Sequence, residues 1–347
     1  MSKNTEYYLE YAAEQVVRLC RIPSPSGFTH SIRNYLMEEL CRIGCQPEVS
    51  RKGSVLVDLG GTGEPLLLAA HVDTLGAMVR SVNRKGGLQL TKIGGYPENY
   101  IESENCLVHT RDGREYSGRI LIKNPAVHVN PETAAKRTLA NMEVILDEKV
   151  FNAEDVKKLG ISAGDFVSFD PRTVRTNSGF IKSRHLDDKA SSGVLLALAC
   201  YLKEQQVALS RQVYLLFTVY EEVGHGGASG LPPDLAEMIS VDMGAVGDDL
   251  GTDEFKVSIC AKDSKGPFDY DVTNRLIRLA QEEKLNYAVD IYPSYGSDAD
   301  VALRAGYDVR HGLIGPGVAA SHGYERVHWE GLQNTFLLLK RYVTTPV

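Results

Sequence analysis

The sequence has little of what marks membrane, secreted or nucleic-acid-binding proteins. No apolar run approaches the roughly 20 residues that a membrane helix needs, and residues 1–10 are polar, without the apolar core of a signal peptide. The net charge of -7 disfavours nucleic acid and anionic membranes as partners. The six cysteines include no Cys-x-x-Cys pair, so we interpret them as reduced, mostly buried thiols. We therefore expect a cytoplasmic protein that binds neither nucleic acid nor membrane.

The 347 residues are enough for two domains. Apolar patterns typical of helices and strands alternate in two separate segments, 1–74 and 184–347, which together predict one discontinuous α/β domain. Residues 75–183 are rich in glycine, arginine and short alternating segments, which predicts a small, mostly β insert with one candidate helix over 133–146. In the α/β domain we expect helices over 5–21, 29–43, 190–204, 272–284, 298–305 and 330–342, and strands over 54–59, 66–70, 213–219, 238–241, 287–292 and 309–314.

Charged residues follow the apolar runs where the expected strands end. Glu221 and Glu222 end the run 213–219, and burying two adjacent carboxylates there is costly unless a cation offsets it. Taken singly, each candidate has an ordinary explanation: the pair as solvated turn residues, Asp187 as a helix cap, Asp242 as a turn residue. Because ligands bind at the carboxyl ends of the strands in an open α/β sheet, the joint pattern points to one site. The candidates are His71, Asp73, Asp187, Glu221, Glu222, Asp242 and His322.

Two imidazoles and several carboxylates are donors that suit a divalent transition metal. We expect zinc, with cobalt or manganese as alternatives. His311, which follows a strand, competes with His322 as the second imidazole. We prefer His322, because a loop that follows Gly315-Pro316-Gly317 can reach the carboxyl edge of the sheet.

Five motifs occur in a fixed order along the chain: His71-Val72-Asp73, Leu186-Asp187-Asp188-Lys189, Glu221-Glu222-Val223-Gly224, Val241-Asp242-Met243-Gly244 and a late His322. In this order they closely resemble the two-metal aminopeptidases. The best match is the glutamyl/deblocking aminopeptidase family, whose members form tetrahedral dodecamers and are often mislabelled endoglucanases. The resemblance covers nearly the whole chain. It implies an α/β fold with a mixed central sheet, helices on both faces and an inserted β domain.

The resemblance also implies a role for each candidate. Asp187 would bridge two divalent ions, with His71 and Asp242 completing one site and Glu222 and His322 completing the other. Two such ions, about 3.5–4 Å apart, polarise the scissile carbonyl and lower the pKa of a shared, metal-bridging water. Glu221 would be the general base that passes the proton of this water to the leaving amine. Asp73 would accept a hydrogen bond from His71 and orient its imidazole.

Three positions depart from the family pattern. Thr74 stands where an acidic residue is usual, and His225 stands where the family usually has leucine. Lys189 comes shortly after Asp187, the residue expected to bridge the metals. At this position lysine and arginine would offer a substrate different donor geometries. None of the roles above falls on these residues. We interpret His225 as a loop residue rather than a third metal-binding imidazole.

The predicted function is hydrolysis of the N-terminal residue of short peptides. A glycoside hydrolase would use Glu221 and a second carboxylate without metal, and it leaves the two histidines unexplained. A non-catalytic metal-binding protein would lack a ligand or the base, and here none is missing. A metal-dependent carboxypeptidase or N-acyl amide deacylase shares these residues, but its extra domain is usually inserted after the paired glutamates. The resemblance further implies a homo-oligomer in which the insert forms dimers and dodecamers are built from them.

Overall fold

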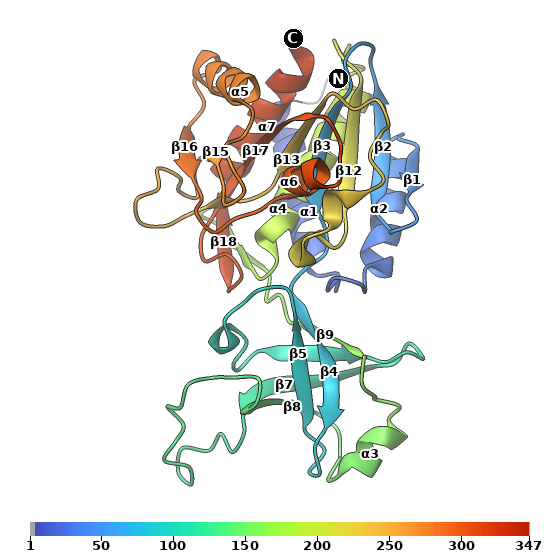
Figure 1. Cartoon of the computed structure of the whole chain (residues 1–347), viewed down its shortest axis with the longest axis vertical. Helices are drawn as coiled ribbons and strands as arrows, with labels where there is room; N and C mark the ends of the chain where they lie inside the picture. The colour runs from blue at the N-terminus through green and yellow to red at the C-terminus, as the bar shows by residue number, and fades with distance from the viewer. Residues whose placement is uncertain (1–3, 347) are drawn as a thin grey trace.

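The structure, a computed structural model, describes residues 4–346. It has two parts, an α/β domain and a closed β-barrel, which lie one above the other in Figure 1. This arrangement confirms the predicted α/β fold with a small β element. Among the described residues, no helix is long and apolar enough to cross a membrane.

The α/β domain is built on a mixed sheet of nine strands. Along the sheet the order is β1 (Pro47–Val49), β2 (Val55–Gly60), β12 (Val213–Thr218), β3 (Leu66–His71), β13 (Glu237–Val241), β17 (Arg310–Val318), β15 (Val257–Lys262) and β16 (Tyr287–Ile291), with β14 (Gly244–Ala245) beside β17. The four central strands β12, β3, β13 and β17 are parallel, so their carboxyl ends meet at one edge. The sequence analysis predicted the central strands but not β15.

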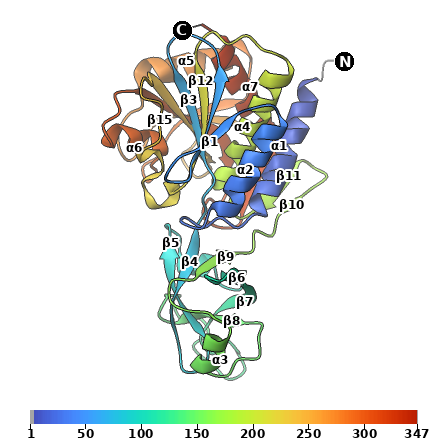
Figure 2. The ribbon, with the colours of Figure 1, turned by 90° about the vertical axis from the view of Figure 1, so that its right-hand side faces the viewer.

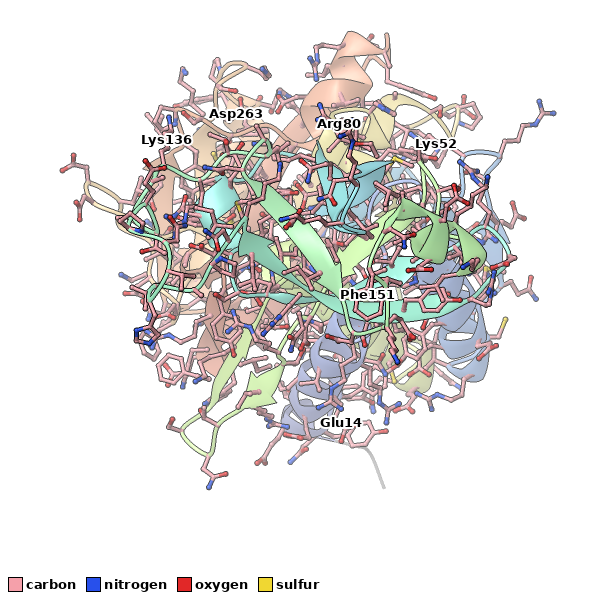
Figure 3. The ribbon with its side chains drawn as sticks, turned by 90° about the horizontal axis from the view of Figure 1, so that it is seen from below. Glu14, Lys52, Arg80, Lys136, Phe151 and Asp263 are labelled. Atoms are coloured by element: carbon pink, nitrogen blue, oxygen red, sulfur yellow. The ribbon has the colours of Figure 1, made fainter. Side chains whose placement is uncertain are left out.

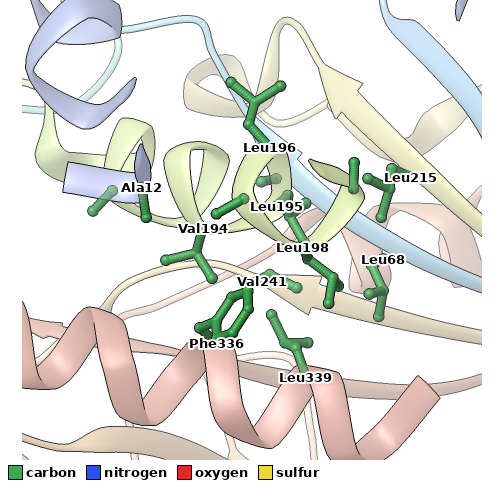
Figure 4. Close-up of a cluster of buried hydrophobic side chains, with 14 of the residues drawn as sticks. Ala12, Leu68, Val194, Leu195, Leu196, Leu198, Leu215, Val241, Phe336 and Leu339 are labelled. Carbon is green, nitrogen blue, oxygen red and sulfur yellow. The ribbon is translucent and has the colours of Figure 1, made fainter. Parts of the chain in front are cut away.

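Helices cover both faces of this sheet (Figure 2). On one face lie α1 (Thr5–Cys20), α2 (His30–Arg42), α4 (Leu186–Glu204), α5 (Tyr270–Glu282) and α7 (Trp329–Thr344), and on the other lies α6 (Asp298–Arg304). Figure 4 shows Val194 and Leu198 of α4 close to Leu68 of β3 and Phe336 of α7. All six residues of β3 are buried, because alternate side chains enter the cores of opposite faces.

The barrel closes in the order β4 (Gly76–Val82), β5 (Leu88–Ile93), β8 (Met142–Leu146), β7 (Glu115–Ile122), β6 (Asn105–His109) and β9 (Phe166–Phe169). It has an apolar core of its own and also carries η1 (Glu98–Tyr100) and α3 (Ala153–Lys158). The predicted helix over 133–146 is wrong, since its last five residues form β8, in which buried and half-buried residues alternate. Figure 3 views this end of the molecule from below, with Arg80, Lys136 and Phe151 labelled.

A small antiparallel sheet packs against helices α4 and α7 of the α/β domain. It consists of β10 (Val174–Arg175), β11 (Phe180–Ser183) and β18 (Glu325–His328), none of which was predicted as an individual strand. Residues 174–183 fall inside the predicted insert of residues 75–183, yet they pair with β18 and not with the barrel. The closed barrel itself therefore ends at Phe169, before the end of the predicted insert.

Candidate metal centre

The edge where the parallel strands end gathers the predicted site residues. His71 is the last residue of β3, and Asp242 directly follows β13. Glu221 and Glu222 begin the short helix η2 (Glu221–Val223) after β12, and His322 lies in the loop after β17. Asp73 lies two residues after β3, and Asp187 stands at the start of α4. Residues from five separate parts of the chain thus meet at the position where this type of sheet binds ligands.

Asp187 lies at the centre of this cluster. Its Oδ1 is 3.1 Å from Nε2 of His71, and its Oδ2 is 3.4 Å from Nε2 of His322. Ligand atoms of His71, Asp187 and Asp242 all lie within 4.8 Å of one another. On the other side, Oε2 of Glu222 is 3.6 Å from Nε2 of His322. The cluster therefore consists of two groups of donors that share one carboxylate.

The two imidazoles are oriented in the same way. Nδ1 of His71 lies 2.9 Å from the carbonyl oxygen of Asp73, and Nδ1 of His322 contacts the carbonyl oxygen of Gly95. A carbonyl can only accept, so each Nδ1 carries a proton and donates it. In the neutral ring the Nε2 lone pair then faces a carboxylate oxygen, and two acceptors in contact need a cation between them. This donor set fits divalent metal ions.

Burial and mutual repulsion of the carboxyl groups also indicate that this cluster binds cations. Burial, together with the charge of Asp187, raises the pKa of Glu222 to about 8 and that of Asp242 to about 7. Burial also raises the pKa of Glu221 well above its usual range. For His71 burial alone would lower the pKa, but the neighbouring carboxylates, Asp187 first, raise it well above the ordinary value. Carboxyl groups buried at this density must hold protons or be neutralised by cations.

Asp73 contacts two site residues through different atoms. Its main-chain carbonyl accepts from His71, whereas its carboxylate Oδ1 is 3.8 Å from the same Nδ1. Oδ1 instead accepts the main-chain N–H of Glu221 at 3.1 Å, and Oδ2 accepts the hydroxyl of Ser26. The carboxylate of Asp73 therefore fixes the start of η2, and its carbonyl orients the imidazole.

The residues that depart from the family pattern point away from the cluster. Thr74 and the buried Lys189 each donate to a main-chain carbonyl, at 3.0 and 2.8 Å. The ring of His225 stacks on Tyr220, with centroids 5.3 Å apart and planes at 19°. The ammonium of Lys52 donates to the carbonyl of His225 at 2.5 Å and to the next carbonyl as well. Lys52 thus closes the loop that follows the paired glutamates.

Sequence analysis assigned no role to two further carboxylates of the site. Oδ2 of Asp188 accepts the main-chain N–H of His71 at 3.2 Å. Glu325 accepts the main-chain N–H of Asp187 at 3.1 Å and that of His322 at 2.9 Å. The contact of Asp188 with His71 and that of Glu325 with Asp187 join residues more than 100 positions apart, so no local pattern predicts them.

A cavity of about 780 Å³ opens over the cluster. Asp187, Glu221, Glu222, Asp242 and His322 form part of its wall, and the rest includes Tyr100, Lys265, Ser294, Tyr295, Ser297 and Arg304. This volume falls in the usual range of small-molecule sites, roughly 300–1,000 Å³.

The M42 glutamyl aminopeptidase family model matches residues 53–338 of the sequence. This chain belongs to that family. It is 45% identical over 337 residues to the putative aminopeptidase YhfE of Bacillus subtilis (strain 168), covering 96% of this chain and 97% of the relative. The predicted family and the peptidase class of hydrolase are therefore confirmed, and peptidases of the M42 family depend on metal.

Two solved structures share the fold of this M42 protein. An aminopeptidase from the archaeon Desulfurococcus kamchatkensis superposes with a TM-score of 0.86 at 23% identity, over 97% of this chain and 95% of that one. The TET1 peptidase of Pyrococcus horikoshii, which can assemble into a tetrahedron or a large octahedral shell, superposes with a TM-score of 0.85 at 20% identity, over 96% of this chain and 99% of that one. Both likenesses extend through the barrel as well as the α/β domain.

Proposed function

We propose that this M42 protein is a two-metal aminopeptidase that removes the N-terminal residue from short peptides. The position of Asp187 carries the proposal, since each oxygen of its carboxylate faces one imidazole nitrogen, at 3.1 and 3.4 Å. His71, Asp187 and Asp242 would hold one cation, and Asp187, Glu222 and His322 would hold the second. Zinc is the proposed metal, while cobalt and manganese suit the same donors.

Glu221 is the proposed general base. When bound, two such cations polarise the scissile carbonyl and make a water between them more acidic. The Glu221 carboxylate takes a proton from the attacking water and gives it to the leaving amine. Burial raises the pKa of Glu221, which helps the group to hold this proton between the two transfers. Asp73 keeps Glu221 in place through its 3.1 Å contact with the main-chain N–H.

A metal-dependent carboxypeptidase or N-acyl amide deacylase is the second candidate. The exposed cations Lys265 and Arg304 also line the cavity, and they would attract a carboxylate of the substrate. In an aminopeptidase this carboxylate would belong to a short peptide that enters amino end first. In the second candidate it would be the terminal carboxylate next to the bond that is cut.

Turnover of a substrate panel by stripped and reloaded enzyme tests the proposal. The chain is treated with a chelator, reloaded with zinc, cobalt or manganese, and assayed on aminoacyl-anilides, N-acyl amino acids and amino-blocked dipeptides. The isosteric Glu221→Gln variant should bind metal as the wild type does and lose at least about a hundred-fold in turnover, because general base catalysis contributes roughly 10²–10⁴-fold. Glu64→Gln, an exposed change at the opposite edge of the sheet, is the matched control.

Each outcome of this assay has a consequence. Metal-dependent release from free-amine substrates, lost in the Glu221 variant and kept in the control, supports the aminopeptidase. Turnover of N-acyl amino acids or amino-blocked dipeptides alone selects the second candidate. Fewer than two cations per wild-type chain under every loading condition contradicts the two-metal site.

We also propose that the insert mediates association into dimers, from which dodecamers are built. Three of its apolar side chains, Val127, Val129 and Phe151, are 67%, 71% and 70% exposed, and such exposure is typical of contact surfaces. Phe151→Glu should therefore lower the molar mass in light scattering, whereas Tyr270→Glu, an exposed aromatic on the α/β domain, should not. An unchanged mass for Phe151→Glu would show that the surface around Phe151 makes no contact between copies.

A further inference from the structure

The segments that carry Asp187 and His322 adjoin two neighbouring strands: Asp187 follows β11, and His322 precedes β18. β11 and β18 pair antiparallel, with Ser183 opposite Glu325. The chain runs from Ser183 directly towards Asp187, and His322 lies just before Glu325. The register of two short strands therefore decides where the bridging carboxylate stands relative to the second imidazole.

Glu325 joins these two loops at their ligand residues. The side chain is buried, with 2% exposure. One oxygen accepts the main-chain N–H of Asp187 at 3.1 Å, and the other accepts that of His322 at 2.9 Å. Because each oxygen already holds an N–H, the carboxylate is engaged in spacing the two ligands and is not itself directed at a cation.

The barrel also contacts the ligands of the second cation position. The loop after β5 provides the Gly95 carbonyl that receives Nδ1–H of His322. At the preceding residue, Gly94, a Cβ would lie 3.6 Å from the Cβ of Glu222, so the loop packs directly against that ligand. Arg184, with 1% side-chain exposure, donates to the carbonyl of Tyr100 at 2.9 Å and to that of His322 at 3.5 Å. The ligands of the second cation position are thus held from the α/β domain and from the barrel.

We infer that Glu325 is a positioning residue that sets the distance between Asp187 and His322 and thereby the affinity of the second cation position. This inference rests on the proposed two-metal function. Of the two ligands that Glu325 holds, Asp187 serves both positions, whereas His322 serves only the second. A change at Glu325 therefore disturbs one ligand of the first position and two of the second, so its larger effect falls on the cation held by Asp187, Glu222 and His322.

The isosteric change Glu325→Gln isolates this role. An amide has one accepting oxygen, so one of the two N–H groups would face an NH₂ donor, and the charge that strengthens both bonds is lost. The second step of a titration with zinc or manganese should weaken by about ten-fold or more, since bonds to charged groups contribute roughly that much. The first step should weaken clearly less, because only one of its ligands, Asp187, contacts Glu325. Glu254→Gln, which removes a partner of Arg326 in the same strand β18, is the matched control.

Calorimetric titration and metal analysis after gel filtration give a result that is independent of turnover. Full turnover should return to Glu325→Gln at high metal concentration, because all ligands remain, whereas His322→Ala should not recover. The melting temperature of the metal-free Glu325→Gln protein serves as the control for folding. A wild type that binds two cations while Glu325→Gln binds both as tightly, or loses both alike, would overturn the inference and leave the function standing. A wild type that never binds two would overturn both.

Discussion

Protons and cations compete for the candidate metal centre, and this competition predicts how stability depends on pH. When a chelator removes the cations, Asp242 and Glu222 titrate at pKa values of about 7 and about 8, against ordinary values near 4. The pKa of His322 rises to about 10, because the contact with Asp187 outweighs burial. Between pH 4 and 8 the folded chain therefore holds protons that the unfolded chain has released. Its stability must fall as pH rises through this window.

The size of the effect follows from the number of protons. Each proton held only in the folded state lowers the free energy of unfolding by about 1.4 kcal/mol per pH unit. One such proton between pH 6 and 8 amounts to about 2.7 kcal/mol, or roughly 4 °C in melting temperature for a chain of this size. Asp187 does not contribute there, because contacts with the imidazoles lower its pKa, and its titration lies in acid.

Melting curves of stripped and Mn²⁺-loaded protein at a fixed free metal concentration measure this difference. The ligands of the metal-loaded protein are deprotonated throughout, so the gap between the two melting temperatures should widen by roughly 4 °C or more from pH 6 to 8. Asp242→Asn removes one titrating group and should flatten the curve of the stripped protein. Parallel curves for the stripped and loaded wild type would refute the idea that these carboxyl groups hold protons in place of cations.

Two further substitutions test how the site is supported. In Gly315→Ala the new Cβ would lie 1.8 Å from the carbonyl oxygen of Asp242. We therefore expect the free energy of unfolding, measured with urea, to fall by about 1–3 kcal/mol or more, and the first cation to bind more weakly. Normal stability and metal content would contradict this. In Lys52→Met the loop after the paired glutamates loses a charged donor to two carbonyls. Turnover of the metal-loaded enzyme should therefore fall about ten-fold, with metal content unchanged. Unaltered turnover would show that the loop holds its position without Lys52.

Much of the catalytic domain could be predicted from sequence because its signals are local. The helix expected over 5–21 is α1 (Thr5–Cys20), and the strand expected over 66–70 is β3 (Leu66–His71). Both are marked by apolar periodicity and by neighbouring turn residues. The helix expected over 133–146 failed because a short amphipathic run is ambiguous, and pairing with β7 and β5 selects the strand β8.

In the site, too, residues with a local sequence signal could be predicted, and residues whose role depends on distant partners could not. His71, Asp242 and the paired glutamates could be located because each follows a recognisable strand. Glu325 could not, because its role depends on the pairing of β11 with β18 and on partners 138 and 3 residues away. The carbonyl of Gly95 has no sequence signal at all, since any residue has a carbonyl and only the position of the barrel brings this one to His322.

The strand order has a consequence for the making of the chain on the ribosome. β2 and β3 are consecutive in sequence, yet β12 lies between them in the sheet. Roughly 140 residues, including the whole barrel, separate the end of β3 from the start of β12, which at 5–20 residues per second takes about 7–28 s to translate. The barrel, with strands close in sequence, can close during this time, while the five apolar core residues of β3 have no neighbouring strand to pair with. Nascent chains stalled before residue 213 should therefore contain a protease-resistant barrel attached to an unfolded, chaperone-binding amino-terminal segment.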